Sequence, residues 1–340
     1  MTNSAQLPLI SKSTNNLLKI IFEMLVLLHH LSFFVVIFGR SLITFFGPLA
    51  VSGFFFCSGY GIGLNYKKKG FTLSKDLLIS KVPKFYLIII ITNICYLLRF
   101  FIIGNSFETP FHLIGAVLNL HVFSSVPILS NWLYFISDLM LYYLLFVLFS
   151  YIFRYHAKSL LYTALSIFVL GLLAILVLTI INSQTGGTMA LRGCLLFPIG
   201  LLACYFNDDI VDLLNNKLLR FLIVINLFIA GGLLFLTLTD SAWQEYLFPI
   251  FFILSLVTLF YKVDFKSKIV DFFSKLVIYV YLSHEFFFKT IPFLYPKIPH
   301  LLNVVLTLVF SLIVSIIIHF IIKGLKPTIK KRFPKIPFLQ

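Results

Sequence analysis

The stretch LLKIIFEMLVLLHHLSFFVVIF, residues 17–38, decides the fold class. It is long enough to cross a membrane, whose hydrocarbon core of about 30 Å requires about 20 apolar residues in a helix. Inside it, Lys19, Glu23 and His30 share one helix face, since the other two lie within roughly 40° of Lys19 around the axis. Ionisable groups at this depth are costly and persist mainly where they face a wet cavity or a partner. The stretch therefore predicts a membrane helix that lines a chemical or transport site.

The composition is that of a membrane protein. Of the 340 residues, 60% are hydrophobic and 11% are charged, and the mean hydropathy is +1.03, far outside the soluble range. The 4 cysteines lie in apolar runs at spacings typical of neither a disulfide nor a metal site, so we assign them to packing. Residues 1–16 lack the short apolar core and the cleavage site of a removable signal peptide, so we expect the first helix to remain as an anchor.

Apolar runs of membrane length recur along the chain and predict an all-α integral membrane protein with about ten transmembrane helices. These runs cover residues 17–38, 43–64, 83–103, 132–153, 160–181, 190–206, 219–238, 246–261, 270–290 and 301–322. Two of them, 190–206 and 246–261, are short for a span. The stretch 112–129 is also fairly apolar, but it carries two histidines, an asparagine and a proline, so we expect a re-entrant or interfacial segment there.

The basic residues orient these helices. A cluster of lysines between Lys67 and Lys84 predicts that the loop after the second span is cytoplasmic. With ten spans, 22 of the 27 Lys and Arg residues fall on the cytoplasmic side, whereas an eleventh span at 112–129 would scatter them over both sides. The charge pattern thus favours ten spans with both termini in the cytoplasm.

Three segments follow from this topology. We expect a cytoplasmic N-terminal segment over residues 1–16, a single polytopic membrane domain over 17–322, and a basic cytoplasmic tail over 323–340. Pro327, Pro334 and Pro337 interrupt this tail, so we expect it to lie along the surface. The net charge of +15 is then explained by topology and by contact with anionic membrane lipids, and no nucleic acid partner is expected.

His30 is the sharpest catalytic candidate. An imidazole takes a proton from a hydroxyl group or attacks an acyl group itself, and its ordinary pKa of about 6.5 suits either role. Glu23 lies two helical turns nearer the cytoplasm and Lys19 three turns nearer. The competing interpretation is that His29 and His30 only form hydrogen bonds between packed helices.

The second and third predicted helices add further candidates. Ser58 contributes a polar group in the second helix, where Gly59 and Gly63 favour close helix packing. Lys81 and Lys84 stand at the start of the third helix. They are either ordinary flanking lysines of a membrane helix or two cations that bind the phosphates of an acyl donor.

Polar side chains also occur in the later apolar runs. Trp132 begins a run that contains Asp138, Arg192 lies just inside another, and His284 and Glu285 lie deep in the ninth. We interpret them either as partners of the catalytic group or as a polar cluster between helices, and we favour the cluster for His284 and Glu285.

Taken together and in this order, the motifs resemble the membrane acyltransferase-3 family. The resemblance rests on Lys19 with His30, Phe54–Tyr60 (FFFCSGY), Lys81–Tyr86 (KVPKFY), Trp132–Tyr134 (WLY), Leu196–Leu202 (LFPIGLL) and Ser274–His284. It covers nearly the whole chain. The sequence departs from the family pattern by lysine at positions 19 and 81, where arginine is usual, and by its doubled histidine.

The resemblance implies transfer of an acyl group, usually acetyl from cytoplasmic acetyl-CoA, to a hydroxyl of a surface or secreted carbohydrate. It implies His30 and Glu23 as catalytic residues, and no metal is expected. Donor- and substrate-binding residues would be Lys19, Ser58, Lys81, Lys84, Trp132, Arg192 and His284. The protein would reside in the cell membrane as a multi-pass protein. The competing hypotheses are a carrier or flippase for a polyprenyl-linked or small anionic substrate, and a scaffold in a polysaccharide-export complex.

Overall fold

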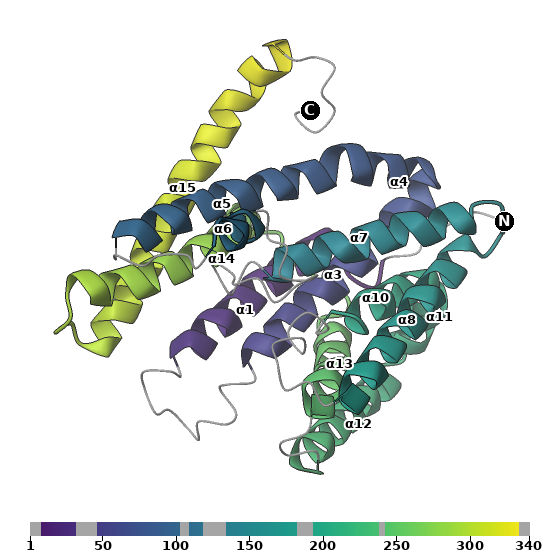
Figure 1. Ribbon diagram of the computed structural model, residues 1–340. Coiled ribbons are helices and arrows are strands. Elements are labelled where there is room, and N and C mark those ends of the chain that lie inside the picture. The colour runs from purple at the N-terminus through teal and green to yellow at the C-terminus, as the bar shows by residue number, and fades with distance from the viewer. Residues whose placement is uncertain are drawn as a thin grey trace. The chain divides into compact units, whose positions relative to one another are not determined.

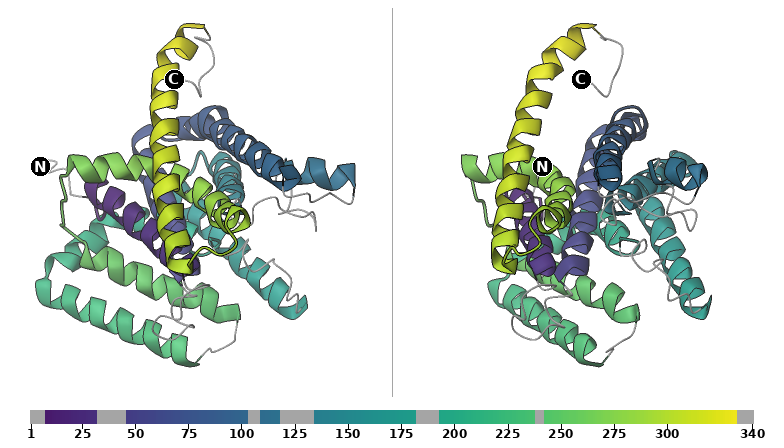
Figure 2. Two further views of the ribbon diagram at one scale, coloured as in Figure 1. Left: turned by 90° about the vertical axis from the view of Figure 1, so that its left-hand side faces the viewer. Right: turned by 60° about the vertical axis from the view of Figure 1, so that its left-hand side comes forward.

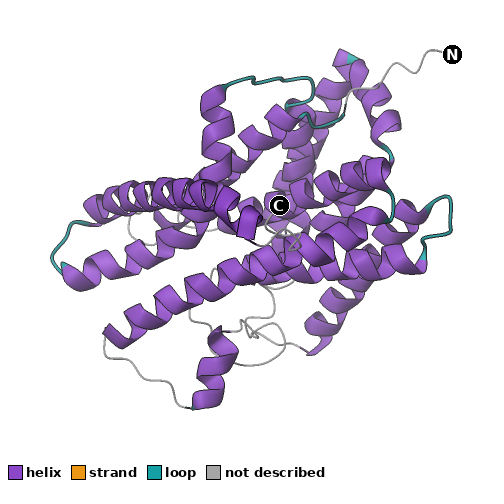
Figure 3. Cartoon of the chain, turned by 90° about the horizontal axis from the view of Figure 1, so that it is seen from above, coloured by secondary structure: helices purple, strands orange, loops and turns teal. Residues whose placement is uncertain are grey.

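The computed structural model describes residues 8–31, 46–102, 109–117, 134–181, 193–237 and 242–332. Every regular element in these ranges is a helix, which confirms the all-α class (Figures 1 and 3). The elements are α1 (Lys12–Leu31), α3 (Phe46–Lys69), α4 (Thr72–Asp76), the π-helix η1 (Leu77–Lys81), α5 (Val82–Ile102), α6 (Pro110–Val117), α7 (Tyr134–Ile152), α8 (Ser159–Ile181), α10 (Leu196–Tyr205), α11 (Asn207–Asn215), α12 (Lys217–Thr237), α13 (Ala242–Leu259), α14 (Lys268–Leu294) and α15 (His300–Arg332).

Among the described residues, 6 helices are long and apolar enough to cross a membrane, in α3, α5, α7, α8, α12 and α15. The protein is thus a multi-pass membrane protein, and the remaining four predicted spans stay predictions. In the described part of the run 190–206, residues 193–206, the helix covers the 10 residues of α10, which rise about 15 Å, half the hydrocarbon core. In the segment 112–129, the described part ends with α6, and the rest lies outside the described residues.

The chain forms two compact units, which we describe separately. Unit 1 comprises residues 1–73 and 148–274, and unit 2 comprises 74–147 and 275–340. In unit 1, α3 is the central helix, since it contacts α1, α10 and α13. It ends because Gly70 adopts a left-handed backbone with φ of 59°, and the Gly70 N–H bonds the carbonyl of Tyr66 at 2.7 Å.

The contact between α3 and α10 depends on the absence of side chains. A Cβ atom at Gly59 would collide with the carbonyl oxygen of Phe197, and one at Gly200 would collide with the carbonyl oxygen of Phe56. One turn further, a Cβ at Gly63 would lie 2.7 Å from the Cβ of Cys204. The two backbones are therefore in direct contact, as small residues permit in membrane helices. Residue numbers rise together along both helices, so α3 and α10 run parallel.

Two other helix pairs of unit 1 run antiparallel. A Cβ at Gly53 would strike the Phe22 ring of α1, and one at Gly47 would lie 2.7 Å from the His29 ring, so α1 runs against α3. Helices α12 and α13 form a hairpin (Figures 1 and 2) whose facing rings include Phe228 with Phe252, at a centroid distance of 5.9 Å.

Hydrogen bonds join the polar end of unit 1 to the start of the chain. The Asn207 Oδ1 atom accepts the Leu9 N–H and the Tyr60 hydroxyl, each at 2.8 Å, and Leu9 is only 4% exposed. Ser13 donates to Asp264, and Asn16 donates to Asp271 at 2.8 Å. The segment before α1 is thereby tied to α11, and α1 itself to α14 and to the segment between α13 and α14.

In unit 2, α5 and α14 run parallel and α15 returns antiparallel. Tyr96 of α5 contacts Phe286 of α14, with ring centroids 5.8 Å apart, and Phe287 stacks on Phe310 of α15. Of the three prolines expected to interrupt the tail, Pro327 does not end the helix, because α15 continues to Arg332, and Pro334 and Pro337 lie outside the described residues. A proline inside a helix removes one backbone hydrogen bond and displaces one turn, which a long helix tolerates as a kink.

Candidate active site

The polar stripe of α1 lies beside the face that packs on α3. Phe22 and His29 point at α3, whereas Glu23 and His30 follow each of them by one residue, roughly 100° around the helix. His29 is therefore a packing residue against Gly47, and His30 belongs to the neighbouring face. The two imidazole rings touch edge to face with a centroid distance of 5.0 Å.

Glu23 and His30 are buried as the sequence predicts for a stripe that faces the protein interior. Glu23 is 5% exposed and His30 is 3% exposed. Among the described residues, neither carboxylate oxygen of Glu23 has a hydrogen-bond partner. A buried carboxylate without a partner is energetically expensive, and membrane proteins keep such groups mainly at functional sites.

Lys19 and Ser58 belong to the opposite end of the stripe from His30. Lys19 is half-buried, and because it precedes Phe22, which meets Gly53, the antiparallel packing of α1 and α3 puts it near the level of Cys57, the residue before Ser58. His29, by contrast, contacts Gly47, which lies 11 residues earlier in α3 than Ser58, or about 16 Å along the helix. Ser58 is thus placed with Lys19, and the structure does not bring it to His30.

Lys81 and Lys84 flank the junction of η1 and α5. The Val82 N–H bonds the carbonyl of Leu77, five residues earlier, which produces the π turn. Pro83 follows directly and has no N–H to donate, so the junction tolerates an irregular turn at this point. Lys81 is exposed, and Lys84 lies in the first turn of α5.

His284 and Glu285 lie in the interior of unit 2. His284 is 1% exposed, and its Nδ1 atom lies 3.2 Å from the carbonyl oxygen of Val280 in the preceding turn of α14. Glu285 is 2% exposed and pairs with Lys289 one turn further on. Neighbouring α7 touches α14 through Phe135 and Tyr281 and carries the fully buried Asp138. This arrangement favours the polar-cluster interpretation of His284 and Glu285.

Sequence reasoning missed a second polar stripe on α15. Asn303, Thr307, Ser311 and Ser315 follow each other at every fourth position and are at most 2% exposed. The Ser283 hydroxyl of α14 lies 3.5 Å from the carbonyl oxygen of Ser311, so the stripe faces α14. The four-residue spacing in an otherwise apolar run was the signal available in the sequence.

Two predicted binding residues, Trp132 and Arg192, lie outside the described residues. The remaining candidates divide between the units: Lys19, Glu23, His30 and Ser58 in unit 1, and Lys81, Lys84 and His284 in unit 2. Across the part of the chain that the structure describes, no group of three His, Cys, Asp or Glu side chains could hold a metal ion.

A chain of membrane-length helices with a buried histidine and carboxylate on one helix face defines a class: a multi-pass membrane protein with a polar interior site. The family comparison makes the class specific, because the model described as an acyltransferase domain matches residues 16–322. The protein belongs to the acyltransferase-3 family and is a membrane acyltransferase. No significant match to a curated protein or to a solved structure was found.

Proposed function

We propose that this acyltransferase moves an acetyl group from cytoplasmic acetyl-CoA to a hydroxyl of a surface or secreted carbohydrate, in the cell membrane. The observation that carries the proposal is the buried stripe of α1, which provides Glu23 and His30 on one face in a chain of this family. Lys19 at one end of the stripe supplies a cation near the donor, and His30 at the other end supplies a base near the acceptor.

The reaction requires two proton transfers, one from the acceptor hydroxyl to His30 and one from His30 to the leaving thiolate. The acceptor hydroxyl oxygen attacks the thioester carbonyl carbon while the His30 imidazole takes the hydroxyl proton. The C–S bond then breaks, and the leaving CoA thiolate takes the proton from the imidazolium, which gives the ester and CoA-SH. Glu23 lies about 10 Å along the helix from His30, too far to touch the imidazole, and we assign it to the same catalytic stripe.

The decisive experiment compares two neighbouring histidines. His30→Ala should lower acetyl transfer by about 10²–10⁴-fold, the usual contribution of a positioned general base. His29→Ala should retain most of the activity, because His29 packs on Gly47 outside the stripe. The measurement is incorporation of labelled acetyl from acetyl-CoA into carbohydrate, in membranes containing equal amounts of each variant.

Three outcomes would contradict the proposal. Near-normal activity of His30→Ala with loss in His29→Ala would move the base to the neighbouring residue. Activity in both variants would exclude a histidine of α1 as the base. Absence of a labelled acetyl ester on carbohydrate with the wild-type protein would contradict acetyl transfer and would favour a carrier or a scaffold.

We further propose that Lys81 and Lys84 bind the phosphates of the donor, which is supported by their position at the basic start of α5. Replacing both with glutamine should raise the KM for acetyl-CoA several-fold and leave kcat nearly unchanged. The matched control replaces Lys68 and Lys69 at the end of α3, two exposed lysines with the same charge. Equal donor KM values for the two double variants would reduce Lys81 and Lys84 to determinants of topology.

A further inference from the structure

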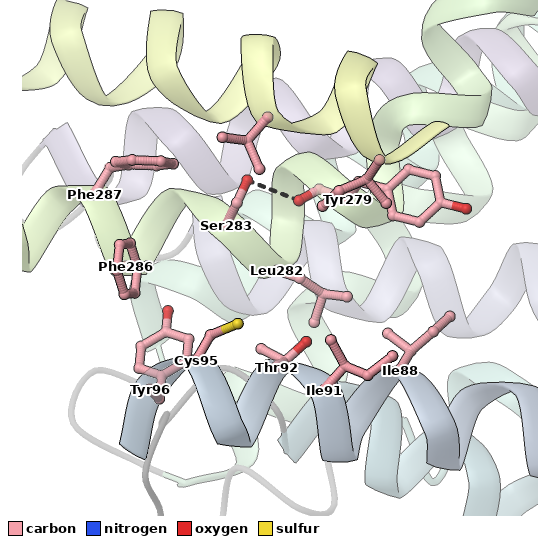
Figure 4. Close-up of a pocket in the computed structure, with 12 residues that line it drawn as sticks. Ile88, Ile91, Thr92, Cys95, Tyr96, Tyr279, Leu282, Ser283, Phe286 and Phe287 are labelled. Atoms are coloured by element: carbon pink, nitrogen blue, oxygen red, sulfur yellow. Dashed lines mark hydrogen bonds between the residues drawn. The ribbon is translucent and has the colours of Figure 1, made fainter. Parts of the chain in front are cut away.

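A groove in unit 2 has not been used by the site described so far. It lies between α5, α14 and α15 and has a volume of about 330 Å³ (Figure 4). Its walls are almost entirely apolar and include Ile91 of α5, Phe286 and Phe287 of α14 and Ile318 of α15. The volume falls within the range of pockets that hold small ligands, about 300–1,000 Å³.

The medium around this groove is hydrocarbon. Both α5 and α15 are candidate membrane spans, and Ile91 in the wall is 53% exposed. The Ser283 hydroxyl in the groove donates to the carbonyl of Tyr279 at 2.8 Å, so its proton is used within α14 (Figure 4). A groove of this kind inside a membrane accommodates a hydrocarbon chain and offers little to a polar molecule.

One end of the groove leads to a cation. Tyr96 and Phe286 touch at this end, and one turn beyond them Arg99 of α5 donates from Nε to the Thr290 hydroxyl of α14 at 2.9 Å. Arg99 is half-buried in the last turn of α5, the position from which a long cationic side chain reaches the level of lipid head groups. Lys289 is also nearby, 44% exposed and paired with Glu285, so two cations and one carboxylate leave a positive excess.

We propose that this groove binds an anionic glycerophospholipid, with one acyl chain along the apolar wall and the phosphate on Arg99. The single bond to Thr290 uses one of the five N–H donors of the guanidinium, and its planar fork matches two phosphate oxygens. Lys289 adds a second positive charge at the same level. The charge at the end of the groove selects an anionic head group over a neutral one, while the groove itself accepts any acyl chain.

Lipid retention provides a direct readout of occupancy. The protein is placed in nanodiscs that contain equal amounts of phosphatidylglycerol and phosphatidylcholine with identical chains. Lipid that remains bound after detergent extraction is identified and counted by native mass spectrometry.

We expect phosphatidylglycerol to be retained on the order of tenfold in preference to phosphatidylcholine, as a charge-assisted hydrogen bond implies. Arg99→Gln should abolish this preference, whereas Lys297→Gln, which removes an exposed cation outside the groove, should keep it. Arg99→Lys keeps the charge without the fork and should retain part of the preference, which provides a test if Arg99→Gln accumulates poorly. Equal behaviour of the two lipids, or a preference that survives Arg99→Gln, would overturn the proposal.

Discussion

A single methyl group at Gly59 tests the packing of the central helix. The Cβ atom of Gly59→Ala would lie 3.0 Å from the carbonyl carbon of Phe197 and closer still to its oxygen. Because these are backbone atoms of α10, no side chain can rotate away, and the two helices must separate. Overpacking of this kind costs about 1–3 kcal/mol. The higher helix propensity of alanine offsets about 1 kcal/mol of this cost, so we expect a net destabilisation of up to about 2 kcal/mol relative to wild type.

Gly61 provides the matched control two residues away in the same helix. A Cβ at Gly61 meets nothing within 4 Å, so Gly61→Ala gains the same propensity without overpacking. The difference between the two alanine variants therefore isolates the contact with α10. The assay is thermal unfolding in one detergent at one scan rate, followed by size-exclusion chromatography, and Gly59→Ala should unfold a few degrees below Gly61→Ala. Equal unfolding temperatures would refute direct backbone contact between α3 and α10.

Two further predictions concern the polar end of unit 1. Asn207→Ala removes the acceptor of two buried hydrogen bonds, so it should destabilise the protein by about 1–3 kcal/mol and expose the N-terminal segment to protease. The control is Asn226→Ala, which should do neither, because Asn226 is exposed and bonds a carbonyl of its own helix α12. Hydrogen bonds from Ser13 and Lys266 hold the pKa of Asp264 below its ordinary value of 3.8. A lowered carboxyl pKa adds stability above that value, which is lost as the pH falls through the lowered pKa. Ser13→Ala should thus unfold at a lower temperature than wild type at pH 7, and the two should converge in acid; a gap that persists in acid would contradict this origin.

The helix class and most helix positions were predictable because hydrophobic runs of membrane length carry a strong signal. The limits of α10 were not, because the run 190–206 is apolar apart from Arg192, and hydropathy does not show where a short helix begins within it. The helix end near Pro327 was not predictable either, because a proline destabilises a helix only locally. The long apolar run before it favours a helix that continues to Arg332.

The site was predictable where it depends on one helix. The 3.6-residue period alone placed Glu23 and His30 on one face, and the structure shows both buried. Contacts between distant segments had no such signal. Nothing in the sequence near Leu9 indicates that its N–H bonds Asn207, which is 198 positions away. The separation of Ser58 from His30 likewise depends on the antiparallel packing of α1 and α3, which a helical period cannot supply.

The parallel pairing of α3 with α10 has a consequence for the synthesis and membrane insertion of the protein. About 130 residues separate the end of α3 from the start of α10, and a ribosome adds about 5–20 residues per second. The glycine face of α3 is therefore in the membrane for on the order of ten seconds before α10 is synthesised. Helix α1 precedes α3 in the chain, so its packing face on α3 is covered earlier. During this interval the bare backbone ridge is open to any other small-residue helix in the same membrane, so the speed of translation between α3 and α10 sets how long the nascent chain is exposed to mispairing.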